Sequence, residues 1–297
     1  MAMKFSLTAA ALALATAGVI PVANAQNVTD VLVQNGAGTT IATDVRSFDE
    51  NEAGSGLAVG FTPVVGSTFT FLYQANVVSF NDAAGQPITP LAGLNSSFAS
   101  GGYEFTIAAS ITETVTSVTA GPGGIISVTF ETTGGTASMF YDSAAGGGVK
   151  SVTNTGAGFD DGTLIGAFDV VGGAGISTFV TFANGAGLGA TQYEFVISAG
   201  TSVDANYISG LTGPISDMHF TSSQVLPPGT SQTTGFHLGT PVNAPDIYAT
   251  TAAGAGMLLK VDGSNTFTTA IPEPETYALM LAGLGAIGFM TRRRRKA

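Results

Sequence analysis

Apolar and polar residues alternate in several segments of the chain. Between residues 103 and 115 most odd positions are apolar and most even positions are polar, and the two departures are Ala108 and Glu113. A period of two is typical of a half-buried strand, and the departures indicate a bend or bulge. Similar alternation occurs in segments 67–73, 125–130, 176–182, 193–197 and 217–221.

Turn signals rich in glycine and proline separate these segments, as in 121–124, 146–148 and 227–229. No helical period is visible outside the two ends of the chain. The pattern therefore predicts an all-β exported domain over residues 26–270, with a β-sandwich or jelly-roll-like architecture. No firm boundary divides this domain.

The N-terminal segment has the parts of a secretory signal peptide. Lys4 precedes an apolar run at 5–20, and Ala23 and Ala25 provide the small residues of a cleavage site. We therefore predict a signal peptide over residues 1–25 that is cut after Ala25. The alternative is an N-terminal membrane anchor that is retained.

The C-terminal segment, 271–297, combines three features. Pro272, Glu273 and Pro274 form an extended motif, because each proline fixes φ and biases the preceding residue away from the helix. An apolar run at 277–290 follows, and about 14 residues make a helix roughly 21 Å long, which is short for a membrane span of about 30 Å. Arg292, Arg293, Arg294, Arg295 and Lys296 then form a basic end that favours the cytoplasmic side. A buried C-terminal core helix is the alternative.

This order of motif, short helix and basic end resembles the PEP-CTERM sorting tail of bacterial exoproteins. The resemblance implies that an exosortase recognises the tail and removes it, in the manner of a GPI-type signal. It also implies transient inner-membrane anchoring followed by release to the cell surface or the extracellular matrix. Glu275 departs from the family pattern, in which a small residue is more common after the second proline.

Charge is sparse in the predicted domain. Only 10% of all residues are charged, the formal net charge is −11, and the only basic residues between the two ends are Arg46, Lys150 and Lys260. Nucleic acid is an unsuitable partner for such a chain, because phosphate binding needs clustered Lys or Arg. Divalent cations and neutral polysaccharide remain compatible with this composition. The absence of cysteine excludes disulfides and thiolate chemistry.

Candidate catalytic residues are few. The chain has two histidines, His219 and His237, and the strand alternation places both on polar faces. No Gly-x-Ser-x-Gly motif provides a nucleophile elbow. We therefore predict no catalytic residues and no enzymatic activity.

Two acidic segments are candidates for binding Ca²⁺. Asp160 and Asp161 precede Gly162, and a second group spans 44–52 with Asp44, Asp49 and Glu50. Carboxylate oxygens suit Ca²⁺, but neither segment has the spacing of an EF-hand loop. We therefore interpret both segments as solvated loops and predict no metal site and no cofactor, with Ca²⁺ binding as the alternative; the Asp161-Gly162 pair also reads as a turn.

Exposed aromatic rings could contact sugars. The chain has 19 Phe and 7 Tyr, most of which the alternation places in the core. Tyr141 and Tyr207 are the residues that we expect to be available for such contacts.

Several short segments of the domain resemble the flocculation-associated group of PEP-CTERM proteins, namely 71–75, 102–105, 140–142 and 159–165. This resemblance implies a structural or adhesive protein of the extracellular polysaccharide matrix, which supports flocculation or biofilm formation. Its partners would be the exosortase, exopolysaccharide and, before processing, the membrane. The alternatives are a Ca²⁺-dependent carbohydrate-binding module and, as a third choice, a secreted hydrolase.

Overall fold

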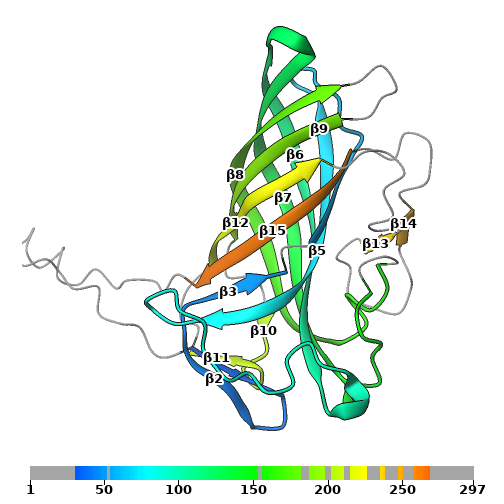
Figure 1. Cartoon of the computed structure of the whole chain (residues 1–297). Coiled ribbons are helices and arrows are strands. Elements are labelled where there is room, and N and C mark those ends of the chain that lie inside the picture. Colours follow the sequence, from blue (N-terminus) through cyan, green and yellow to red (C-terminus); the bar gives the residue numbers. More distant parts are fainter. Residues whose placement is uncertain are drawn as a thin grey trace, which may run out of the picture. The chain divides into compact units, whose positions relative to one another are not determined.

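Antiparallel strands dominate the structure, which is a computed structural model (Figure 1). It describes residues 31–51, 54–152, 156–181, 187–197, 202–210, 215–225, 235–237, 247–249 and 257–267. These residues belong to one compact unit, Thr29–Ala270. The all-β class expected from the alternation is confirmed, and the helices of the described residues are three short 3₁₀ turns.

The strands are β1 (Val31–Gln34), β2 (Thr40–Val45), β3 (Ser47–Glu50), β4 (Gly54–Val59), β5 (Thr68–Asn81), β6 (Tyr103–Ala120), β7 (Ile125–Ser143), β8 (Thr163–Thr181), β9 (Gly187–Ile197), β10 (Ser202–Val203), β11 (Ile208–Ser209), β12 (Ile215–Val225), β13 (Gly235–His237), β14 (Ile247–Ala249) and β15 (Met257–Phe267). The 3₁₀ turns are η1 (Phe98–Ser100), η2 (Pro122–Gly124) and η3 (Ala144–Gly146). No helix in the described part of the chain has the length and apolar character needed to cross a membrane.

The long strands form one sheet that closes on itself. β5, β6, β7 and β8 are consecutive antiparallel neighbours. β5 also pairs with β3 and β4, and both of these pair with β15. The sheet continues from β15 through β12 to β9, which pairs back with β8.

This connectivity differs from the expected β-sandwich or jelly roll, in which two sheets pack face to face. The physical reason lies in strand length, because β6, β7 and β8 have 18 or 19 residues each. Twist accumulates along such strands and curls the sheet until its first and last strands can pair. Pairing of β9 with β8 then satisfies backbone groups that two free edges would expose.

The strand expected over 103–115 is confirmed as part of β6, and so is its irregularity. The pairing of β6 with β7 shifts register between Thr112 and Glu113 and again between Val115 and Ser117. Such shifts bend a strand and increase its local twist. The bend therefore contributes to the curvature that closes the sheet.

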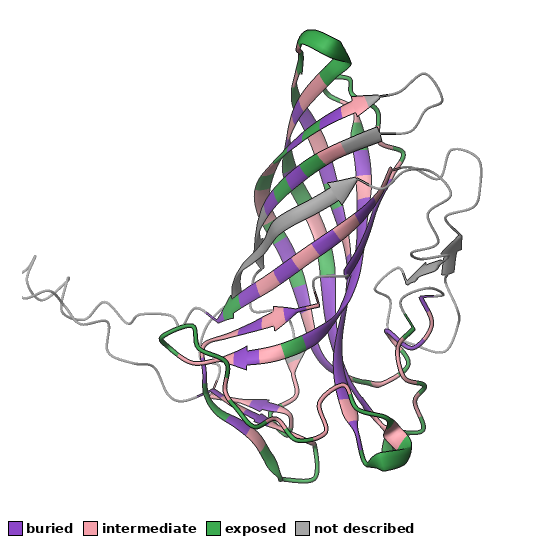
Figure 2. Ribbon diagram, viewed as in Figure 1, coloured by how far each residue is buried: buried purple, intermediate pink, exposed green. Residues whose placement is uncertain are grey.

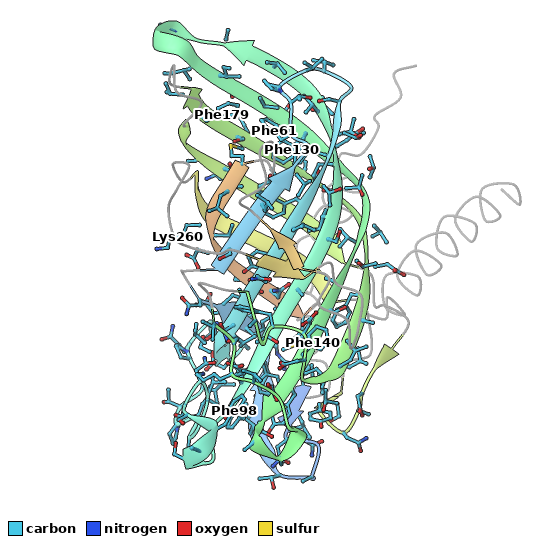
Figure 3. All side chains as sticks on the ribbon, turned by 90° about the vertical axis from the view of Figure 1, so that its right-hand side faces the viewer. Phe61, Phe98, Phe130, Phe140, Phe179 and Lys260 are labelled. Carbon is cyan, nitrogen blue, oxygen red and sulfur yellow. The ribbon has the colours of Figure 1, made fainter. Side chains whose placement is uncertain are left out.

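Aromatic side chains fill the core. Phe71 of β5 stacks on Tyr193 of β9 with ring centroids 4.8 Å apart, and Phe130 of β7 lies 4.7 Å from the same ring. Phe61 contacts Phe179 at 5.8 Å, near one end of the sheet (Figure 3). These contacts connect strands that are distant in sequence, so the core stabilises the closed arrangement.

Part of the opposite face of β6 and β7 is buried as well (Figure 2). The alternation predicted that Glu104 and Thr106 lie on a polar face, yet their exposed fractions are 0% and 1%. A covering segment, residues 144–152 and 156–162, is hydrogen-bonded to this face. The Thr106 hydroxyl donates to the Phe159 carbonyl at 2.7 Å, and the Ser151 N–H donates to Glu104 Oε1 at 2.6 Å.

Candidate functional site

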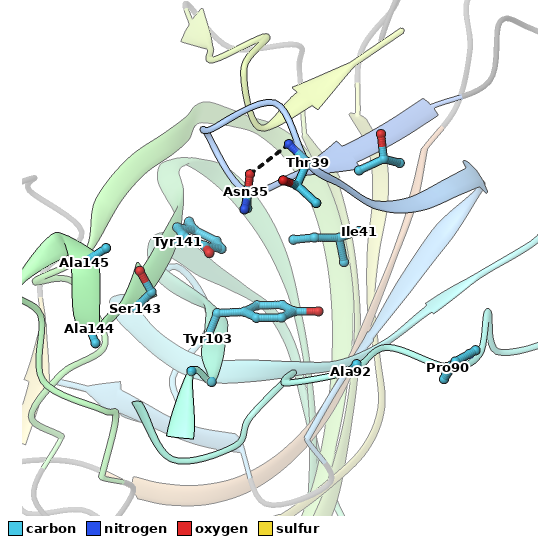
Figure 4. Close-up of a pocket in the computed structure, with 13 residues that line it drawn as sticks. Asn35, Thr39, Ile41, Pro90, Ala92, Tyr103, Tyr141, Ser143, Ala144 and Ala145 are labelled. Atoms are coloured by element: carbon cyan, nitrogen blue, oxygen red, sulfur yellow. Dashed lines mark hydrogen bonds between the residues drawn. The ribbon is translucent and has the colours of Figure 1, made fainter. Parts of the chain in front are cut away.

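A pocket of about 530 Å³ lies where the β1–β2 turn, the β5–β6 connection and the end of β7 meet (Figure 4). Its lining residues are Asn35, Thr39, Thr40, Ile41, Pro90, Ala92, Gly101, Gly102, Tyr103, Tyr141, Ser143, Ala144 and Ala145. None of these described residues carries a charge. The lining therefore combines aromatic and small apolar groups with hydroxyls and one side-chain amide.

Two tyrosines from neighbouring strands form the aromatic part of the pocket. Tyr103 begins β6, and Tyr141 lies near the end of β7 opposite Phe105. Tyr103 lies two residues before Phe105, so both side chains are on the same face of β6. The Tyr103 ring therefore reaches the Tyr141 ring and stacks on it, with the ring centroids 5.9 Å apart. Tyr141 is 9% exposed and Tyr103 is half-buried. Tyr103 is thus the ring that is more available to a ligand.

A third tyrosine, Tyr207, packs against Tyr141. The Tyr207 ring lies 5.1 Å from that of Tyr141. Gly36 makes room for Tyr207, because a Cβ at that position would lie 2.3 Å from Tyr207 Cζ. Gly36 also has φ +76°, a conformation that suits glycine. The β1–β2 turn and Tyr207 therefore fit together only with glycine at position 36.

Both pocket phenols have a raised pKa. Burial, with a smaller contribution from the neighbouring Tyr141, raises the pKa of Tyr103 to about 12. Burial is also the main cause of the raised pKa of Tyr141. Neutral phenols can donate hydrogen bonds while their rings offer an apolar face. A pocket with rings, hydroxyls and an amide suits a ligand that alternates apolar faces with hydroxyl groups.

Of the two tyrosines expected to contact sugars, one lines the pocket and the other packs beside it. Tyr141 lines the pocket, whereas Tyr207 contacts Tyr141 and is not among the lining residues. Tyr103 was expected to lie on the apolar face of a strand and was not named as a sugar contact, although Gly101 and Gly102 directly before it are a turn signal. The approach of Tyr103 to Tyr141 depends on strand register, which single-strand alternation does not give.

Asp160 and Asp161, the Ca²⁺ candidates, lie in the covering segment. Asp161 Oδ2 accepts a hydrogen bond from the Val149 N–H at 2.9 Å, so this carboxylate anchors the segment's own backbone. Asp142 lies close enough for Asp161 to affect its ionisation, and burial is the main cause that raises the pKa of Asp142 to about 6. Within the described ranges, no three His, Cys, Asp or Glu side chains form a group that could hold a metal ion.

Glu50 is a buried carboxyl group, which corrects its interpretation as part of a solvated loop. It ends β3 and is 1% exposed, because the alternation that buries Phe48 also turns Glu50 toward the core. The Tyr73 hydroxyl donates to Glu50 Oε2, and Asn265 Nδ2 donates to Glu50 Oε1. Burial is the largest cause that raises the pKa of Glu50 to about 8.

Glu113, which interrupts the alternation of β6, is a second buried acid. It is 0% exposed, and its Oε1 accepts a hydrogen bond from the Thr132 hydroxyl at 2.9 Å. Its Oε2 has no hydrogen-bond partner among the described residues. Burial raises the pKa of Glu113 to about 8, so the group is mostly neutral at pH 7.

Several predicted site residues lie outside the described residues. They are the cleavage-site residues Ala23 and Ala25, the motif Pro272, Glu273 and Pro274, and the basic end Arg292, Arg293, Arg294 and Arg295. The apolar run at 277–290 lies outside them too. For His219 and His237 the backbone is described, in β12 and β13, but the side chains are not.

Comparison with known proteins bears on this C-terminal tail. Residues 270–295 match the family described as the PEP-CTERM protein-sorting motif. No curated protein and no solved structure matches the chain. The matched segment includes the proline motif, the apolar run and most of the basic end. The chain thus carries a PEP-CTERM sorting motif, which marks it as an exported substrate of an exosortase.

Proposed function

We propose that this protein is a structural or adhesive component of the extracellular polysaccharide matrix that supports flocculation or biofilm formation. The sorting motif supports export and processing by an exosortase. The observation that carries the polysaccharide part is the uncharged pocket with Tyr103 and Tyr141 in its lining. Its rings can pack on sugar faces while Asn35 and Thr39 hydrogen-bond to sugar hydroxyls. The proposal includes no catalytic activity.

After processing, the all-β domain acts at the cell surface or in the matrix. The low charge of the domain is compatible with a neutral polysaccharide, because few charged side chains have to be desolvated when such a polymer binds. A single pocket of this size gives modest affinity for one glycan segment. Retention of a long polymer then depends on many copies of the protein acting together.

A Ca²⁺-dependent carbohydrate-binding module is the second candidate. It is favoured by the proximity of Asp142 to Asp161 and by Asp142 Oδ2, which accepts no hydrogen bond from the described residues. Ca²⁺ bound there would neutralise the two carboxylates and hold the covering segment, which also supplies Ala144 and Ala145 to the pocket. The two candidates therefore differ in whether chelation of Ca²⁺ abolishes glycan binding.

The test is co-sedimentation of the mature protein with exopolysaccharide extracted from the same host. We expect binding that survives EDTA, and loss of binding on EDTA treatment would select the Ca²⁺-dependent module. Ala92→Gln should reduce binding at least tenfold, because it fills the exposed mouth of the pocket without truncating a core side chain. Ala84→Gln, in the exposed turn at 82–85, is the matched control and should bind normally.

A conservative pair of variants tests the role of the ring. Tyr103→Phe keeps the aromatic face and should retain most of the binding, whereas Tyr103→Ala should lose it. Equal binding by Ala92→Gln, Tyr103→Ala and the unmodified protein would refute the pocket as the polysaccharide site. A mutant host lacking the protein should also settle more slowly than one complemented with the unmodified gene.

A further inference from the structure

Lysine, glutamate and asparagine side chains meet beneath the covering segment. Asn76 comes from β5, Glu104 from β6 and Lys150 from the covering segment. Lys150 Nζ lies 3.3 Å from Glu104 Oε2, and Asn76 Nδ2 lies 3.0 Å from the same oxygen. One carboxylate oxygen therefore holds an amine and a carboxamide next to each other.

The surroundings of this group restrict water and fix the carboxylate. Glu104 is 0% exposed and Asn76 is 9% exposed. The Ser151 N–H and hydroxyl donate to the two carboxylate oxygens at 2.6 and 2.9 Å. The Phe98 ring lies 5.9 Å from Lys150 Nζ and covers one side of the amine. Thus an amine, an amide group and a fixed carboxylate meet here, with the carboxylate and the amide buried and the Lys150 side chain 39% exposed.

We propose that Lys150 and Asn76 become joined by an intramolecular isopeptide bond, with Glu104 as the proton carrier. Glu104 accepts a proton from the Lys150 ammonium, and the freed Nζ attacks Cγ of Asn76. The Cγ–Nζ bond forms and the Cγ–Nδ2 bond breaks. Nδ2 takes up the two protons that Nζ loses, one of them through Glu104, and leaves as ammonium. The reaction needs no oxidant, reductant or external reactant.

Such a bond would tie the covering segment to β5 across the intervening strand β6. The chain has no cysteine, so disulfides cannot provide a covalent tie in the exported protein. A cross-link between positions 76 and 150 restricts the unfolded chain in the same way as a disulfide that closes a long loop. The ion pair alone would add little, because the Lys150 side chain is 39% exposed.

Mass spectrometry of the purified protein tests this proposal directly. The intact mass should be lower than the sequence mass by one molecule of ammonia, after allowance for the processed ends. A glutamyl endopeptidase acting on the unfolded protein cuts after Glu52, Glu104, Glu131 and Glu194. It should release peptides 53–104 and 132–194 as one covalent pair.

Separate peptides of full mass would overturn the proposal. Ammonia can also be lost when an asparagine before glycine, such as Asn35, cyclises to a succinimide. An intact mass lowered by ammonia without the covalent pair would therefore count against the bond as well. The paired peptide decides between the two reactions because only the isopeptide bond joins two segments.

Three variants test the assigned roles. Lys150→Arg keeps the positive charge and Glu104→Gln keeps the shape of the carboxyl group, and both should give full-mass, unlinked protein. Lys260→Arg, on β15, is the matched control and should keep the covalent pair. A covalent pair that persists in Lys150→Arg would show that another residue forms the link, and its persistence in Glu104→Gln would refute the role of Glu104.

Discussion

Glu113 should make the protein less stable as the pH rises, and its replacement by glutamine should remove that effect. Burial raises the pKa of Glu113 from 4.5 to about 8, and the Thr132 hydroxyl donates a hydrogen bond to it. The folded protein therefore holds a proton that the unfolded chain releases between these values. Stability from this group is complete below pH 4.5 and is lost as the pH rises through 8.

The size of the effect follows from the same values. Each pKa unit corresponds to about 1.4 kcal/mol, so the free energy of unfolding should fall by about 3 kcal/mol between pH 5 and pH 8 because of Glu113 alone. Glu50, whose pKa is also raised to about 8, adds a similar fall. Glu113→Gln should remove about half of the combined pH dependence, because the amide is neutral throughout.

The assay is urea unfolding of the mature protein, followed by far-UV circular dichroism at pH 5, 6, 7 and 8. Between pH 5 and pH 8, the free energy of unfolding of Glu113→Gln should rise by about 3 kcal/mol relative to that of the unmodified protein. Glu131→Gln, at an exposed position of β7, is the matched control and should keep the full slope. The reasoning fails if Glu113→Gln and the unmodified protein show the same slope.

The remaining predictions concern sorting and the histidines. Changing Pro272 and Pro274 to Ala should leave unprocessed protein in the inner membrane, because the extended recognition motif is lost while the apolar anchor stays. Replacing the four arginines at 292–295 by Gln should instead release soluble protein of nearly full length, since the short apolar run at 277–290 then lacks its orienting charges. Immunoblots of cell fractions check both, and normal maturation of both variants would contradict the sorting role. His219→Gln with His237→Gln should leave settling of cells unchanged, because the strand alternation places both residues on polar faces and no role is predicted for either. Loss of settling by a normally exported double variant would reopen the enzyme hypothesis.

Local patterns were sufficient for parts of the long strands β5, β6, β7, β8, β9 and β12 and for the sorting motif. Alternation over 103–115 predicted β6 because a period of two depends only on each residue's position along its own strand. The motif around Pro272 to Pro274 was recognisable because a linear signal is read as an extended peptide, without a folded partner. Neither inference needed contacts between distant segments.

The tertiary structure decided which polar positions are buried. Glu104 follows the polar alternation of β6, yet Ser151, which is 47 positions further along the chain, covers it. Glu113 breaks the alternation and is buried against Thr132 of the neighbouring strand. Alternation indicates the face on which a side chain lies, but the burial of that face depends on segments that pack against it from elsewhere in the chain.

Closure of the sheet and formation of the pocket both depend on contacts between segments that are distant in the sequence. Tyr103, Tyr141 and Tyr207 are spread over about a third of the chain, and strand pairing together with the turn that contains Tyr207 brings their rings together. A sandwich and a closed sheet are built from similar alternating strands, so alternation does not distinguish them. The amino-acid sequence by itself determined the all-β class, the sorting motif and the low charge of the domain. The pairing of β8 with β9, which depends on accumulated twist and on contacts between distant strands, is what only the tertiary structure decided.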